Sequence, residues 1–281
     1  MRQFAPYPIY ISGAAFDQDF RAFVERISPW LSDETKKWLN RWSYRLMDHA
    51  KARDERPAAL AYEHQVQMVL AEINGTQVGR TLLKCLPPEV PIWILRYDEQ
   101  QGGAAVTGQM SSDHTKGVRI MQYSAEMWLG GADGRVYPGF RSDEVMFHEM
   151  VHAYRFARFG FDGMNHDPLR DNDDHEEFLA TQLGNVYRSG KKAQKFRHNY
   201  MTGKLGAKAD VEHILQSYEP FLRAIEDFLS DPMVAQMARI QTDFNPFRDL
   251  ARLKQARAQD LRSRTDTRPT TRGGLPPPVR Y

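Results

Sequence analysis

Two histidines four residues apart constrain the fold of this chain more than any other feature. His148 and His152 lie in the segment His-Glu-Met-Val-His. On an α-helix, residues four apart project from the same face, so the two imidazoles could reach one cation. Ser142 precedes Asp143 and Glu144, which suits a helix N-cap followed by acidic residues at the positive end of the dipole. The pattern therefore predicts a helix that starts near Ser142 and presents two metal ligands.

Glu149 follows the first histidine directly, where its carboxylate could act on a water held by the metal. Zinc lowers the pKa of such a water to about 7 and also polarises a carbonyl group. Glu149 would accept the proton from this water and so serve as the general base of a hydrolysis reaction. The cofactor predicted by this set of residue types is Zn2+.

A catalytic zinc needs three protein ligands and one open position. Glu176 and Glu177 begin the next predicted helix, about 24 residues after His152. Either glutamate could complete the site if this helix packs against the first. However, Asp173 with Glu176, or Asp174 with Glu177, also matches a capping box, which would give the glutamate a purely structural role. Minor ligand candidates lie in or beside the connecting loop: His166, Asp167 and His175.

The His-Glu-Met-Val-His segment and the Glu-Glu-Phe-Leu-Ala segment at 176–180 together resemble the gluzincins, in which a glutamate on the second helix is the third ligand. More narrowly, they are similar to bacterial effector metallopeptidases, which include type III effectors and the light chains of clostridial neurotoxins. The resemblance covers residues 115–200. It implies an α+β fold with a zincin-like core, a small mixed sheet beside two active-site helices. It also implies cleavage of a target-cell protein bound as an extended strand.

The resemblance leaves a choice between two glutamates for the third ligand. Alignment with the toxins favours Glu176, whereas the pattern of a glutamate followed by a small residue at the third position selects Glu177 with Ala180. We prefer Glu177, because the small residues that follow it would let the second helix approach the first. The other glutamate would then orient a histidine. The zincin form with a third histidine is excluded, since Arg155 and Arg158 occupy the required positions.

Such enzymes commonly place a Tyr, Arg or His opposite the metal to stabilise the oxyanion. Four side chains after the glutamates could do so: Tyr187, Arg197, His198 and Tyr200. We select His198 and Tyr200 as catalytic candidates, while Tyr187 could equally belong to the core. The strand predicted at 118–123 could be the edge strand that pairs with an extended substrate, or an ordinary interior strand.

The pattern of apolar residues divides the chain into regions. Helical periodicity extends to about residue 75, with amphipathic stripes at 16–27, 32–47 and 57–73. Short β runs follow at 81–86, 92–97 and 118–123. The predicted regions are a helical N-terminal region at 1–76, a metallopeptidase core at 77–245, a charged helix at 246–262 and a disordered tail at 263–281.

Composition excludes several classes of function. The chain has 38 Lys+Arg against 36 Asp+Glu, so its charge does not favour nucleic acid or a membrane as the partner. Cys85 is the only cysteine, which excludes an intramolecular disulfide framework. The sequence contains neither a secretory signal nor a long apolar run. It therefore predicts synthesis as a cytoplasmic chain, and the resemblance to bacterial effector metallopeptidases implies delivery from the bacterial cytoplasm by a specialised secretion system.

Two alternatives to a proteolytic effector follow from the same residues. One is a housekeeping cytoplasmic zinc peptidase, which would share the chemistry and differ in its place of action. The other is a non-catalytic helical interaction module, which the basic, proline-rich tail and the helical first third would suit. Zinc content separates the module from either peptidase.

Overall fold

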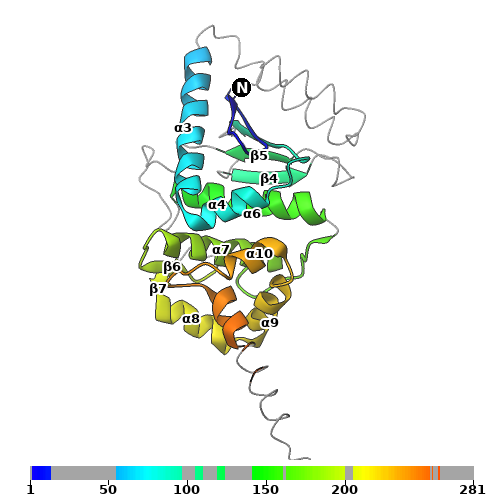
Figure 1. Ribbon diagram of the computed structural model, residues 1–281, viewed down its shortest axis with the longest axis vertical. Helices are drawn as coiled ribbons and strands as arrows, with labels where there is room; N and C mark the ends of the chain where they lie inside the picture. Colours follow the sequence, from blue (N-terminus) through cyan, green and yellow to red (C-terminus); the bar gives the residue numbers. More distant parts are fainter. Residues whose placement is uncertain are drawn as a thin grey trace, which may run out of the picture.

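The computed structural model describes residues 2–13, 55–96, 105–109, 119–123, 141–160, 163–199 and 205–253, together with Gln255 and Gln259. The fold is α+β, as the sequence predicts. Figure 1 shows a small sheet at one end and further helices at the other. Helices α6 (Ser142–Phe159) and α7 (His175–Gly190) lie between these two parts and pack against each other.

A five-stranded mixed sheet has the order β1-β2-β3-β5-β4. Its strands are β1 (Arg2–Gln3), β2 (Ile9–Ser12), β3 (Ile92–Arg96), β4 (Ala105–Gln109) and β5 (Arg119–Tyr123). Strand β3 runs parallel to β2 and β5, while β1 and β4 pair antiparallel with their neighbours. The first four residues of β3 are buried, as expected of a strand with a parallel neighbour on each side.

The strands predicted at 92–97 and 118–123 correspond to β3 and β5. However, β5 pairs with β3 on one side and with β4 on the other. Its role as an edge strand is therefore wrong, and the alternative of an interior strand is correct. Within the described sheet, β4 is the outer strand at this end, and it contacts α6.

The start of the chain is not helical, which corrects the prediction for residues 1–76. Strands β1 and β2 form an antiparallel pair there, and β2 joins the sheet beside β3. Ile9 and Ile11 are fully buried, which is the alternation expected of a strand. The helix predicted at 57–73 lies within α3 (Glu55–Gly75). The helices predicted at 16–27 and 32–47 fall outside the described residues.

The strand predicted at 81–86 is wrong, because residues 81–85 belong to helix α4 (Gln77–Cys85) and Leu86 is its C-cap. The Thr76 side chain caps the helix by accepting a hydrogen bond of 2.8 Å from the backbone N–H of Gly79. Val78, Leu82 and Leu83 are buried at helical spacing. Gly79 permits the close turn from α3, since a Cβ atom there would lie 2.0 Å from the carbonyl oxygen of Ile73.

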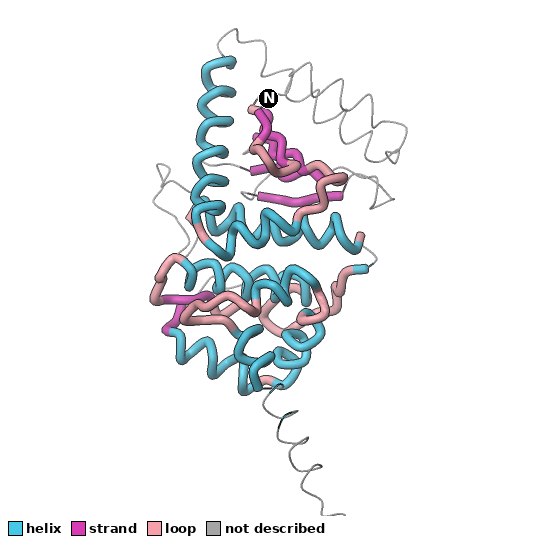
Figure 2. The backbone as a smooth tube through the Cα atoms, in the orientation of Figure 1, coloured by secondary structure: helices cyan, strands magenta, loops and turns pink. Residues whose placement is uncertain are grey.

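The C-terminal third adds short elements, most of which lie on the side of α7 away from α6 (Figure 2). They are β6 (Lys195–Arg197), β7 (Leu205–Ala207), α8 (Lys208–Ser217), α9 (Glu219–Phe228) and α10 (Pro232–Met237). Strands β6 and β7 pair antiparallel in a separate sheet of two strands. Residues 246–253 are also helical, within the charged helix predicted at 246–262. The tail predicted at 263–281 falls outside the described residues.

One cluster of buried side chains runs from Tyr7 to Phe247. It includes residues of α3, the five-stranded sheet, α6, α7 and the C-terminal helices. The core therefore crosses the boundary predicted at residue 76, because α3 packs against α6. Both faces of α6 are covered, which holds this helix firmly in place.

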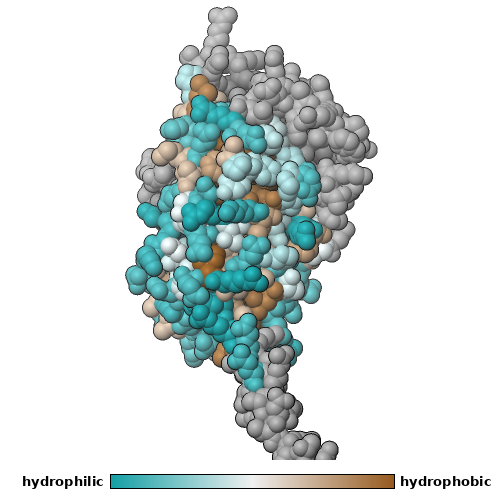
Figure 3. All heavy atoms as spheres, in the orientation of Figure 1, coloured by the Kyte–Doolittle hydropathy of each residue, from teal (hydrophilic) through white to brown (hydrophobic). Residues whose placement is uncertain are grey.

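Among the helices of the described residues, none combines the length and the apolar character that crossing a bilayer requires. Figure 3 shows hydrophilic side chains over much of one face, with apolar side chains scattered between them.

Candidate metal centre

Helix α6 carries the histidine pair and is anchored at its start by the sheet. The hydroxyl of Tyr123 in β5 donates a hydrogen bond of 2.8 Å to the backbone carbonyl of Ser142. Ser142 is the first helical residue and Arg141 occupies the cap position, so the N-cap predicted at Ser142 is wrong by one residue. Asp143 and Glu144 lie in the first turn, as predicted.

His148, His152 and Glu177 converge on one point between α6 and α7. The Nε2 atom of His148 lies 3.0 Å from Oε2 of Glu177, and Nε2 of His152 lies 3.3 Å from Oε1. The two Nε2 atoms are 3.1 Å apart. Among the described residues, these three form the group of His, Cys, Asp or Glu side chains that could hold a metal ion.

The donor set consists of residue types that bind metal ions, zinc among them. Three ligand atoms at about 2.0–2.2 Å from a tetrahedral zinc ion lie about 3.3 Å from one another. In this group the two Nε2 atoms are 3.1 Å apart, and they lie 3.0 and 3.3 Å from the two different carboxylate oxygens of Glu177. Two imidazole nitrogens and one carboxylate oxygen also leave a fourth position for water or substrate.

The start of α7 explains how Glu177 reaches the histidines. Asp174 is the N-cap, and its side chain accepts a hydrogen bond of 2.8 Å from the backbone N–H of Glu177. One of the two hydrogen bonds of the predicted Asp174–Glu177 capping box is therefore present. The Glu177 side chain takes no return bond to the cap and instead contacts His148 and His152.

Glu176 points to a different partner and does not join the metal group. Both of its carboxylate oxygens accept hydrogen bonds from the Arg155 guanidinium, at 2.9 Å from Nε and 2.8 Å from Nη2. The backbone N–H of Asn165 donates a third bond of 3.0 Å to Oε1. The structure therefore corrects two expectations, since Glu176 neither lies at the candidate ligand position nor orients a histidine.

The charges around the site favour an ionised carboxylate. Burial would raise the pKa of Glu177, but the hydrogen bonds and charges of both histidines hold it well below its usual range. Burial keeps the pKa of His148 below its usual value. Burial acts in the same direction on His152, yet the hydrogen bond that His152 donates to Glu177 and the negative charges of Glu177 and Glu149 outweigh it and raise that pKa to about 9.

Glu149 is half-buried beside this group. Its negative charge acts on both histidines, which places its carboxylate within electrostatic range of each. It lies outside the three-atom cluster of candidate ligands. A carboxylate close to the metal but not bound to it is the arrangement that a general base requires.

Two of the candidates for oxyanion stabilisation, Tyr187 and His198, have other neighbours in the described part of the chain. Among the contacts that it describes, none joins His198 to the metal group. His198 instead lies against β7, where a Cβ atom at Gly206 would come within 1.9 Å of its Nε2 atom. Tyr187 is a core residue that stacks on Phe147 and donates a hydrogen bond of 2.7 Å to Asp143. Tyr200 falls outside the described residues.

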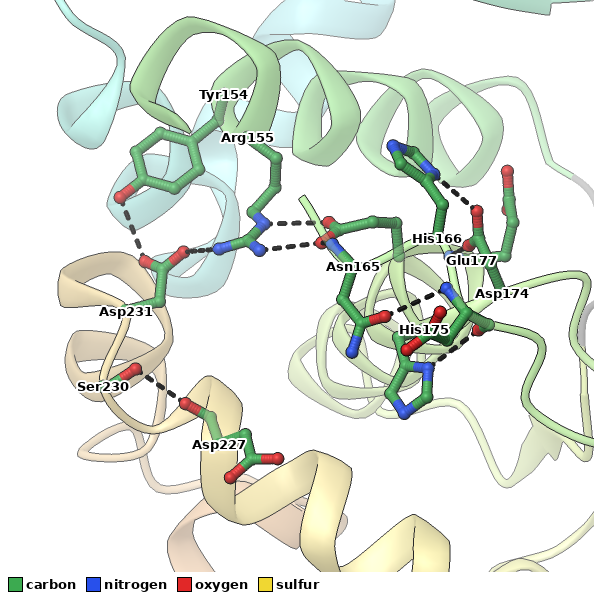
Figure 4. A network of polar contacts seen from close by, with 12 residues as sticks. Tyr154, Arg155, Asn165, His166, Asp174, His175, Glu177, Asp227, Ser230 and Asp231 are labelled. Carbon is green, nitrogen blue, oxygen red and sulfur yellow. Dashed lines mark hydrogen bonds and ion pairs between the residues drawn. The ribbon is translucent and has the colours of Figure 1, made fainter. Parts of the chain in front are cut away.

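Other side chains near the loop also have partners of their own. His166 pairs with Asp174 at 2.8 Å, and Nδ1 of His175 lies 2.8 Å from the backbone carbonyl of Asp167. Figure 4 shows these contacts beside the Arg155 network. Among the described residues, His166, Asp167 and His175 are not part of the group formed by His148, His152 and Glu177.

A cavity of about 240 Å³ is lined by residues that include Arg155, Phe159, His175 and Asp231. None of the three candidate metal ligands lines it.

Arg155 and Asp231 were not predicted as functional residues. The signal for Arg155 was present, because it follows His152 by three residues and so lies on nearly the same face of the helix. The partnership with Asp231 spans 76 residues of sequence and left no local signal.

The chain matches no protein-family model, no curated protein and no solved structure. Its function is therefore inferred from the residues of the site and from the resemblance of residues 115–200.

Zinc binding is expected to release about one proton per ion near neutral pH. With a pKa of about 9, His152 is protonated in the metal-free protein at neutral pH, and the metal must displace that proton. Zinc affinity should therefore rise with pH, by about tenfold per pH unit, and level off as the pH passes the pKa of His152. Calorimetric titrations in buffers of different ionisation enthalpy measure the released proton. Heats that do not depend on the buffer would contradict this prediction.

Proposed function

We propose that this protein is a zinc-dependent peptidase in which His148, His152 and Glu177 hold the metal and Glu149 is the general base. The observation that carries the proposal is the convergence of two imidazole nitrogens and one carboxylate oxygen within 4.8 Å, with Glu149 beside them. The three residues of the His-Glu-x-x-His motif lie on α6, and Glu177 lies on α7, which packs against it. This arrangement fits hydrolysis better than a purely structural metal site, which would close the fourth position.

In the proposed hydrolysis, each residue of the site has a separate role. Zinc, when bound, supplies a Lewis acid that polarises the scissile carbonyl and makes water more acidic. Glu149 takes a proton from the attacking water and can pass it to the leaving amine. Glu177 stays ionised because both histidines stabilise its charge. The core on both sides of α6 keeps His148 and His152 in register with α7.

The proposed substrate is a peptide bound as an extended strand. Strand β4 supports this part of the proposal, because it is the outer strand of the described sheet at this end and lies against α6. An extended peptide can add to such an edge through main-chain hydrogen bonds. The proposal that the substrate is a target-cell protein depends on the resemblance of residues 115–200 to effector metallopeptidases.

The zinc-loaded protein is expected to cut unfolded proteins and peptides at defined bonds. Mass spectrometry of new N-termini in a lysate or a peptide library identifies these bonds. A chelator should abolish their formation, and added zinc should restore it. The Glu177→Ala variant should produce none of them. Cleavage that survives the chelator, or a zinc-loaded protein that generates no new N-termini, would contradict the proposal.

A further inference from the structure

A buried arginine links the metal centre to the C-terminal part of the fold. Arg155 lies one helical turn beyond His152 on α6, and its side chain is only 7% exposed. Its guanidinium binds Glu176 with two hydrogen bonds and Asp231 with a third of 2.7 Å. Figure 4 shows Arg155 and Asp231 within this network of contacts.

We propose that Arg155 is a positioning residue for the metal centre. By binding Glu176, Arg155 keeps the carboxylate of the adjacent residue, Glu177, close to His148 and His152. This inference depends on the metal centre of the proposed function, and it does not depend on the nature of the substrate. It gives Glu176 a role in placing Glu177, in place of the expected role of orienting a histidine.

The geometry of the Arg155–Glu176 pair supports a positioning role. A guanidinium that forms two parallel hydrogen bonds with a carboxylate restricts its orientation as well as its distance. Glu176 has a side chain only 2% exposed, and it occupies the first turn of α7 next to Glu177. Arg155 lies on the same helix as both histidines. The pair therefore fixes the first turn of α7 relative to the helix that carries the other two ligands.

The opposite side of Arg155 is held as firmly. The Asp231 carboxylate that binds Arg155 also accepts hydrogen bonds from the Tyr154 hydroxyl, at 3.0 Å, and from the backbone N–H of Met233, at 2.8 Å. The second of these caps α10. The ring of Phe159 lies 4.3 Å from the guanidinium carbon, which adds a cation–π contact. These contacts leave the guanidinium little freedom to turn away from Glu176.

The chain offers a matched pair at the far end of the same two helices. Arg188 of α7 binds Glu144 of α6, and the two side chains are 10% and 9% exposed. Arg188 is eleven residues from Glu177, or about 16 Å along the helix. Loss of this pair should loosen the contact between α6 and α7 without moving the first turn of α7. Arg188→Lys is therefore the control for Arg155→Lys.

The experiment compares zinc dissociation constants, measured by competition with a chromogenic chelator, for the wild type and for Arg155→Lys, Glu176→Gln and Arg188→Lys. Lysine keeps the charge but cannot form the two parallel bonds, and glutamine keeps the shape of Glu176 without its charge. Arg155→Lys and Glu176→Gln should each weaken zinc binding by about 10–100-fold. Arg188→Lys should weaken zinc binding by less than about threefold, because Arg188 is remote from the metal ligands.

The double variant and the stability of the metal-free proteins separate positioning from general destabilisation. If Arg155 acts through Glu176, the double variant Arg155→Lys/Glu176→Gln should lose little more affinity than either single variant. Thermal unfolding of the metal-free proteins should show comparable losses for Arg155→Lys and Arg188→Lys, so that the difference appears in metal affinity.

Wild-type zinc affinity in Arg155→Lys and Glu176→Gln would overturn the inference, and so would an equal loss in Arg188→Lys. A wild type that binds zinc with the expected pattern of variants but cuts no peptide would overturn the peptidase and leave the inference standing. A wild type without zinc would overturn both.

Discussion

Replacing Glu149 with Gln is expected to lower peptidase activity by about 10²–10⁴-fold while the zinc content stays at the wild-type level. The change removes the charge and keeps the shape of a side chain that lies near both histidines but outside the ligand cluster. Glutamine cannot accept the proton that the general base must take. Measurement of kcat on a peptide that the wild type cuts, with zinc quantified on the same sample, tests this expectation.

The control for this substitution is Glu219→Gln, which removes the same charge from an exposed side chain on α9. It should leave both zinc content and kcat unchanged. Near-normal cleavage by Glu149→Gln would exclude a general-base role for Glu149. Loss of zinc from Glu149→Gln would instead indicate that this residue helps to hold the metal.

Replacing His148 or His152 with Ala is expected to abolish stoichiometric zinc binding. Each histidine supplies one of three protein ligands, so its loss leaves only two. If zinc binding of about 10–16 kcal/mol is shared among three protein ligands, one ligand contributes about 3–5 kcal/mol, or about a 10²–10⁴-fold change in Kd. Glu177→Ala should have a similar effect. Elemental analysis after dialysis against a weak chelator measures the zinc that remains.

His213→Ala is the matched control, because His213 is an exposed histidine on α8. It should retain about one zinc per chain. Retention of zinc at wild-type affinity by both His148→Ala and His152→Ala would show that the metal binds elsewhere. The substitutions should leave the helical content unchanged, because zinc is not needed to complete the hydrophobic core around α6.

The sequence correctly predicted strand β3 and helix α6, because each has a clear local pattern. Strand β3 has a continuous apolar run, and the helix of the histidine motif has acidic residues in its first turn. The prediction that residues of both helices form one metal-binding group agrees with the structure. The choice of Glu177 came from small residues that let two helices approach, which is a packing argument and needs no alignment.

The errors arose where the decisive contact was distant or where two patterns overlapped. Leu82, Leu83 and Leu86 suit a strand as well as a helix, and only the cap at Thr76 distinguishes them. Strand β2 is four residues long, and its place beside β3 is set by pairing across about 80 residues of sequence. The role of Glu176 depends on Arg155 and, through it, on Asp231. Such pairings follow from tertiary packing, so a single sequence does not show them.

X-ray absorption at the zinc edge, recorded on the zinc-loaded wild type, tests the central claim most directly. It reports the number and kind of atoms bound to the metal. We expect about one zinc per chain, with two imidazole nitrogens and oxygen ligands at about 2.0–2.2 Å and no sulfur. A spectrum that requires a sulfur ligand, or one with fewer than two imidazoles, would contradict the proposed centre.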